Sequence, residues 1–149
     1  MVTMAATETD YVEALNSALL LEYNALEAYD VAIERLDHEE LVTQMRRFRE
    51  DHIRHIEDLT SIVRGHGHEP HKSTGAKSMI TAGKVALADL AGDKAILRAM
   101  KTNEDDTVTA YERLLGHERS LPEAAEAVRR GHEDELRHRA WMEDAAARL

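Results

Sequence analysis

A pattern of acidic residues and histidines occurs twice in the chain. Its six members are Glu22, His52 and His55 in the first half and Glu104, Glu135 and His138 in the second. The leading Glu precedes its first partner by 30 positions in one half and by 31 in the other, and the two partners are three positions apart. Residues i and i+3 share one face of a helix, so each pair could bind the same ions. Carboxylates and imidazoles suit iron, zinc and manganese, and the pattern therefore predicts a metal site inside a four-helix bundle.

A tyrosine follows each leading Glu by seven positions. Tyr29 follows Glu22, and Tyr111 follows Glu104. The simpler interpretation is that both tyrosines are core residues whose hydroxyl groups donate hydrogen bonds to ligand carboxylates. The alternative is a redox role, in which the two rings give or relay an electron.

The six residues fall on helix stripes that are otherwise apolar. An unpaired carboxylate in an apolar core costs several kcal/mol, so three of them on inward stripes favour a compensating cation. Counted from the expected hairpin turns, all six should meet at one level near the middle of the bundle. The alternative is a structural polar network, in which the Glu and His residues satisfy one another without metal.

The composition favours a single all-helical domain over residues 1–149. The chain has seven glycines, two prolines and no cysteine, and the lack of cysteine excludes thiolate and iron–sulfur sites. A net charge of −10 argues against nucleic acid as a partner. No apolar run approaches the ~20 residues of a membrane span, and no secretory signal is evident at the N-terminus. We therefore expect a cytoplasmic protein without a membrane partner.

Apolar spacing predicts helices over residues 10–36, 39–64, 76–90, 94–117 and 121–148. Asp10 with Glu13, and Ser120 with Glu123, resemble capping boxes at the start of the first and the last helix. The connection between the second and the third long helix has about thirty residues, far more than a bundle turn of roughly 2–8. The sequence therefore predicts an all-α four-helix bundle with one long crossover that contains the short helix.

The chain resembles the ferritin-like superfamily, particularly rubrerythrin and bacterioferritin domains. One stretch is similar to their ligand-bearing first helix, through Leu15, Asn16, Leu19, Glu22, Ala25 and Tyr29. The spacing of Glu135 and His138 matches the motif of their fourth helix, and Glu104 takes the place of the Glu in the third. The resemblance implies a ferritin-like bundle with two iron ions that oxidises ferrous iron with dioxygen or peroxide. Its role would be iron handling or protection against oxidative stress.

One position departs from the family pattern. Where those proteins have a bridging Glu on the second helix, this chain has His52. The exchange removes one bridge and leaves three carboxylates instead of four, and it favours metals that accept nitrogen ligands. We expect Glu104 or Glu135 to bridge, with Glu22 and the three histidines in terminal positions. Two iron ions are the first expectation, with zinc or manganese as alternatives.

Three functions remain open from the sequence. The first is a ferroxidase or peroxidase-type oxidoreductase. The second is a non-enzymatic metal-binding stress protein in which iron or zinc is structural. The third is a metal-free helical interaction module. A homodimer is the expected assembly in each case.

Overall fold

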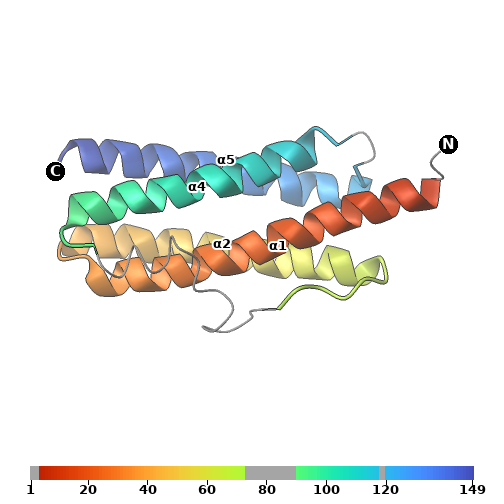
Figure 1. Ribbon diagram of the computed structural model, residues 1–149, viewed down its shortest axis with the longest axis horizontal. Coiled ribbons are helices and arrows are strands. Elements are labelled where there is room, and N and C mark those ends of the chain that lie inside the picture. The colour runs from red at the N-terminus through yellow and green to blue at the C-terminus, as the bar shows by residue number, and fades with distance from the viewer. Residues whose placement is uncertain (1–3, 73–89, 118–119) are drawn as a thin grey trace.

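The structure is a computed structural model that describes residues 4–72, 90–117 and 120–149. These residues form four helices and no strand: α1 (Met4–Arg35), α2 (Glu39–Gly65), α4 (Asp93–Leu115) and α5 (Pro122–Ala147). Figure 1 shows two layers, the hairpin of α1 and α2 and the hairpin of α4 and α5. The all-α four-helix bundle that the sequence predicts is confirmed.

Each helix packs against two neighbours. α1 contacts α2 and α4, and α5 contacts the same two helices. Neighbouring helices run antiparallel, and the two diagonal pairs run parallel (Figure 1). Every helix therefore presents one inward stripe to a common core, and side chains from all four helices can meet there.

The end of α2 and the start of α4 lie at opposite ends of the bundle. Asp93, in the first turn of α4, accepts a hydrogen bond from the backbone N–H of His38 at 3.0 Å, beside the turn between α1 and α2. The chain that follows α2 lies at the other end, where Asn16 donates a hydrogen bond to the carbonyl of Glu69 at 3.0 Å. The chain between Gly65 and Asp93 therefore joins opposite ends of the bundle, as the predicted long crossover requires.

Three helices begin and end within two residues of their predicted bounds, but the predicted start of the first helix at residue 10 is wrong. α1 begins at Met4, because the residues before Asp10 include two alanines and no glycine or proline that would stop a helix. At α5 the N-cap position is Leu121, without a side-chain capping bond, so Ser120 does not cap the helix. The predicted short helix over 76–90 lies outside the described residues except at Leu90, where the backbone is not helical.

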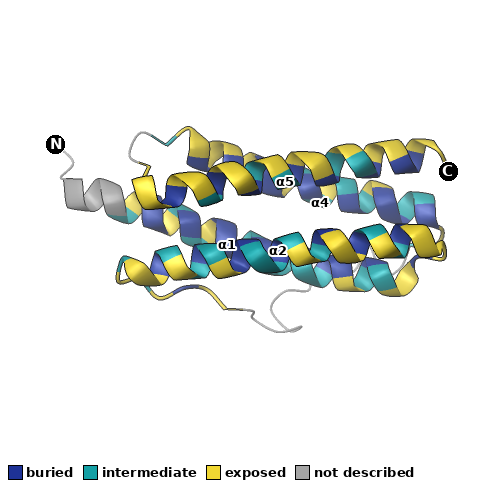
Figure 2. Cartoon of the chain, turned by 180° about the vertical axis from the view of Figure 1, so that it is seen from behind, coloured by how far each residue is buried: buried dark blue, intermediate teal, exposed yellow. Residues whose placement is uncertain are grey.

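Two apolar clusters fill the two ends of the bundle. The cluster near the turn between α1 and α2 contains Phe48, Leu97 and Met142. The cluster at the opposite end contains Leu15 and Val128. Figure 2 shows the buried faces of the helices turned inward and the exposed faces outward. A layer of buried polar side chains lies between the clusters, and none of the helices in the described ranges is long and apolar enough to cross a membrane.

Candidate metal centre

The six predicted ligand residues come together in the polar layer. They are Glu22 on α1, His52 and His55 on α2, Glu104 on α4, and Glu135 and His138 on α5. None of the six is more than 3% exposed. Each hairpin supplies one residue from its first helix and two from its second, which is the arrangement that the repeated pattern predicts.

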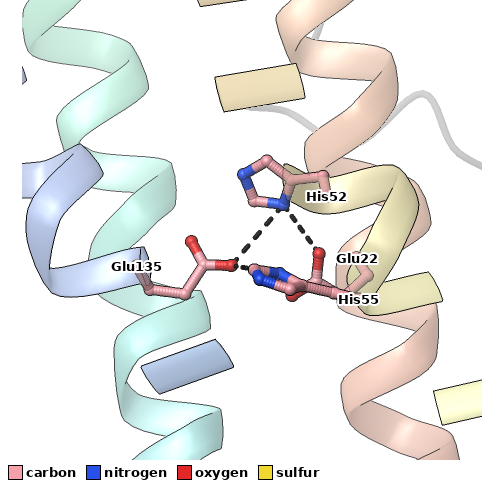
Figure 3. Close-up of side chains that lie close together, drawn as sticks. All are labelled: Glu22, His52, His55 and Glu135. Atoms are coloured by element: carbon pink, nitrogen blue, oxygen red, sulfur yellow. Dashed lines mark hydrogen bonds and ion pairs between the residues drawn. The ribbon is translucent and has the colours of Figure 1, made fainter. Parts of the chain in front are cut away.

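The six side chains form two overlapping groups that could each hold a metal ion. Group A consists of Glu22, His52, His55 and Glu135, and group B consists of His52, Glu104, Glu135 and His138. His52 and Glu135 belong to both groups. Figure 3 shows group A, with side chains from α1, α2 and α5 converging on one point.

Group A is closely connected by hydrogen bonds and ion pairs. Nδ1 of His52 donates a hydrogen bond to Oε2 of Glu22 at 2.6 Å. Nδ1 of His55 lies 3.2 Å from Oε1 of Glu22 and 3.1 Å from Oε1 of Glu135 (Figure 3). Four possible metal-ligand atoms, from three helices, are therefore turned toward a shared position.

Group B has wider spacings. Oε1 of Glu104 lies 3.4 Å from Nε2 of His52 and 3.7 Å from Nδ1 of His138. Nδ1 of His138 also lies 3.5 Å from Oε2 of Glu135. The two oxygens of Glu135 thus face different groups, Oε1 facing group A and Oε2 facing group B. Of the two predicted bridging residues, Glu135 is the one placed between the groups.

Three atoms of the cluster are buried and lack a hydrogen-bond partner among the described residues. They are Nε2 of His52, Nδ1 of His138 and Oε1 of Glu135, and their nearest ion-pair contacts lie at 3.4, 3.5 and 3.1 Å respectively. Leaving such atoms unsatisfied in a core costs about 1–3 kcal/mol each, so proteins rarely do so without a reason. A bound cation would use the lone pairs of all three. The donor atoms present therefore fit metal ions held by nitrogen and oxygen ligands.

The two tyrosines hold the leading Glu residues from across the bundle. The hydroxyl of Tyr29 donates a hydrogen bond to Glu104 at 2.5 Å, and the hydroxyl of Tyr111 donates one to Glu22 at 2.9 Å. Burial and the nearby carboxylate charges raise the pKa of both phenols well above its ordinary value, so both stay protonated. These contacts agree with the simpler interpretation of the tyrosines, and their redox role stays a prediction.

Two aspartates that the sequence analysis did not single out orient the terminal histidines. Nε2–H of His55 donates a hydrogen bond to Asp134 at 2.9 Å, and Nε2–H of His138 donates one to Asp51 at 2.9 Å. Each bond joins α2 to α5. Because a carboxylate accepts the proton on Nε2, the other nitrogen, Nδ1, is turned toward the cluster in both rings.

Two arginines brace these aspartates. Nη2 of Arg137 lies 2.9 Å from carboxylate oxygens of both Asp51 and Asp134, and Arg54 contacts the same two residues. Burial alone would raise the pKa of both aspartates, but hydrogen bonds from the histidines and Arg137 lower it. A signal was available in the sequence, since residues 51–55 read Asp-His-Ile-Arg-His and residues 134–138 read Asp-Glu-Leu-Arg-His.

Charges within the cluster shift the pKa values of its members in opposite directions. Burial would raise the pKa of Glu22, but the charges and hydrogen bonds of His52 and His55 outweigh it and lower that pKa. Burial and the Glu104 carboxylate raise the pKa of Glu135 well above its ordinary value. Burial lowers the pKa of His55, yet its acidic neighbours raise it overall to about 9. The cluster thus holds protons that a bound cation would displace.

One family model matches the chain, over residues 10–117, and its description is Domain of unknown function (DUF2383). No curated protein and no solved structure matches the chain. The matched range includes Glu22, His52, His55 and Glu104 and ends before α5.

Proposed function

The chain belongs to the DUF2383 family, and we propose that it is a ferritin-like protein that binds two metal ions, iron foremost, in groups A and B. The observation that carries the proposal is the set of three buried ligand-type atoms that have no hydrogen-bond partner among the described residues, one each on His52, Glu135 and His138. The long crossover and the antiparallel packing of neighbouring helices support the ferritin-like assignment.

The possible ligand atoms would divide evenly between two ions. Glu22 and the Nδ1 atom of His55 would hold the ion in group A, and Glu104 and the Nδ1 atom of His138 the ion in group B. Glu135 would bind both ions, one through each oxygen. Bound iron supplies one-electron redox chemistry at a position that the apolar clusters on both sides shield from water.

The reaction that we propose is the oxidation of ferrous iron by peroxide or dioxygen, in iron handling or protection against oxidative stress. With peroxide as the oxidant, two bound ferrous ions would supply one electron each and solvent two protons, which together would convert the peroxide to two molecules of water. Tyr29 and Tyr111 keep Glu104 and Glu22 in place during this change of charge, because their hydroxyl groups stay protonated and continue to donate. Thr107, whose hydroxyl lies 3.1 Å from Glu104 and 3.3 Å from Glu135, supports Glu104 as well and also contacts Glu135.

The test is the number of ions bound by each chain and the response to an oxidant. We expect protein reconstituted with ferrous iron in the absence of oxygen to bind about two ions per chain by elemental analysis. Addition of peroxide or dioxygen should then produce ferric absorption. Glu135→Ala should abolish stoichiometric binding, and the matched control Glu133→Ala, at an exposed position beside it, should bind as the wild type does. Full binding by Glu135→Ala would contradict the proposed ligand set.

A second candidate is a protein that binds metal without turnover. It is favoured by the dense hydrogen bonding of the ligands themselves, since Glu22 alone accepts bonds from His52, His55 and Tyr111. In that case the protein would bind zinc or iron and become more stable. Its bound ferrous iron would be oxidised no faster than ferrous iron free in solution, as followed by ferric absorption.

A further inference from the structure

His52 belongs to both group A and group B. Its two ring nitrogens face different groups. Nδ1 lies 2.6 Å from Glu22 and 3.5 Å from Glu135, in group A. Nε2 lies 3.4 Å from Glu104, in group B, and has no hydrogen-bond partner in the part of the chain that the structure describes. Figure 3 shows one ring nitrogen turned to Glu22 and Glu135 and the other turned away from them.

We infer that His52 bridges the two ions, binding one through Nδ1 and the other through Nε2. The inference rests on the proposed binding of two ions and assigns the ligand atoms of that site. His52 is buried with no exposed surface, and its ring packs at 4.7 Å from the ring of Tyr29 and at 5.1 Å from that of His138. These neighbours hold the ring between the groups, so each nitrogen keeps its own direction.

The symmetry of the bundle gives a second argument for the bridge. His52 and Glu135 occupy the same position in the repeated stretches 51–55 and 134–138. Glu135 already places one oxygen toward each group. Its counterpart on α2 does the same with two nitrogens. Each ion would then have one Glu, one Nδ1 of a terminal histidine, one oxygen of Glu135 and one nitrogen of His52.

The bridge also changes the charge that the protein offers. An imidazole that donates a lone pair from both nitrogens carries no ring N–H proton and has one negative charge; a neutral His52 would release its one ring N–H proton to solvent as the metal binds. Together with Glu22, Glu104 and Glu135 it supplies four negative charges. On this proposal, His52 in place of a bridging Glu would remove neither a bridge nor a negative charge. The bridge favours ions that accept nitrogen ligands.

The direct test is nuclear magnetic resonance of wild-type protein labelled with ¹⁵N in its histidine rings and loaded with ¹¹³Cd²⁺. Scalar coupling between ¹⁵N and ¹¹³Cd identifies each nitrogen that binds the metal. We expect coupling at both nitrogens of His52, each to a different cadmium signal, and at Nδ1 alone in His55 and His138. The variant His52→Gln assigns the signals. Coupling at a single nitrogen of His52, or at neither while two ions are bound, would overturn the bridge but not the proposed metal binding.

A titration of the variants with Cd²⁺, followed by calorimetry, gives an independent readout. His55→Gln should weaken one of the two binding steps, and His138→Gln the other. His52→Gln should weaken both steps, each by more than the 10–100-fold typical of an outer-shell partner, and His52→Glu should recover two-ion binding through a carboxylate bridge. If His52→Gln weakens one step alone, His52 is a terminal ligand. If wild-type protein binds neither Cd²⁺ nor ferrous iron, the proposed function fails and the bridge fails with it.

Discussion

At the scale of single residues, the hydrogen bonds around the cluster run from one hairpin to the other. His55 on α2 bonds Asp134 on α5, and His138 on α5 bonds Asp51 on α2. The tyrosine bonds to Glu22 and Glu104 also cross between the hairpins. The directions of four of the six predicted ligand side chains are therefore set by a residue of the other hairpin; these four are Glu22, His55, Glu104 and His138.

We expect Asp134→Ala to weaken metal binding about 10–100-fold, because the ring of His55 loses the acceptor that keeps Nδ1 turned toward group A. Asp134→Asn should recover part of the loss, since its amide oxygen can still accept the bond from Nε2–H. Titration with Co²⁺, followed by its visible absorption, measures the affinity. Asp30→Ala removes an ion pair with Arg49 outside the cluster and should leave the affinity unchanged. An equal loss in both alanine variants would contradict the orienting role.

Gly131 on α5 makes room for the ring of Tyr111. A Cβ atom at this position would lie 2.5 Å from Cε1 and 2.7 Å from Cζ of that buried ring. We expect Gly131→Ala to lower the free energy of unfolding by about 1–3 kcal/mol, as overpacking does in cores. Denaturant unfolding measures the effect. Gly65→Ala, where nothing lies within 4 Å, should leave stability unchanged or raise it, and the same result for Gly131→Ala would refute the argument.

Residue types and spacing were enough to predict which six side chains meet, because inward Glu and His residues on apolar stripes are rare and the pattern repeats. They were not enough for Asp51 and Asp134, which directly precede His52 and Glu135 and therefore lie at the edge of the inward stripe. Helical periodicity says which side of a helix a residue occupies. It does not say which residue of a neighbouring helix stands opposite.

At the scale of elements, Asp93 joins the first turn of α4 to the turn between α1 and α2. Its carboxylate accepts bonds from the backbone N–H groups of Asp37 and His38 and pairs with the His38 ring. The hydrogen bond and charge of Asp93 raise the pKa of His38 above its ordinary 6.5. Burial opposes the shift at Asp93, but these hydrogen bonds lower its pKa below the ordinary 3.8.

The contacts of Asp93 with Asp37 and His38 form a clasp between α4 and the turn that precedes α2. This clasp makes the stability of the protein depend on pH in a defined window. A raised pKa at His38 gives stabilisation that is complete below about pH 6.5 and is lost as the pH rises through the folded-state pKa. A lowered pKa at Asp93 gives stabilisation that is present above about pH 3.8 and is lost as the pH falls. The Tm difference between wild type and His38→Gln should therefore be largest near pH 5–6 and shrink toward pH 9. A constant difference across that range would contradict the clasp, and His71→Gln, at an exposed position, should show none.

The helix bounds show what local sequence can predict for an element. The breaks between α1 and α2 and between α4 and α5 could be predicted because the apolar stripe stops there. The start of α1 was missed because Asp10 and Glu13 carry a capping pattern inside a stretch that continues as helix. A capping pattern permits a helix to begin, and the preceding residues decide whether it does.

At the scale of the whole molecule, the protein holds the six Glu and His side chains in one buried layer. Metal binding to them should raise the free energy of unfolding. Each ion present at one hundred times its Kd stabilises the folded state by about 2.7 kcal/mol. For a chain of this length, about 2–4 °C of Tm accompanies each kcal/mol, so we expect a rise of about 5–10 °C per ion. Differential scanning calorimetry with metal, and then with chelator, measures it. Glu135→Ala should not respond, and a wild-type Tm that ignores both additions would support the metal-free module.

The crosswise bonds also determine how far along the bundle axis one hairpin lies relative to the other. Two hairpins joined by apolar layers alone could slide by one helical turn, about 5.4 Å, and bury a similar area. Here such a slip would break all four crosswise bonds together and leave charged groups unpaired in the core, at a cost of several kcal/mol. The polar layer therefore sets the register of the two hairpins, as a single buried polar residue does in a coiled coil.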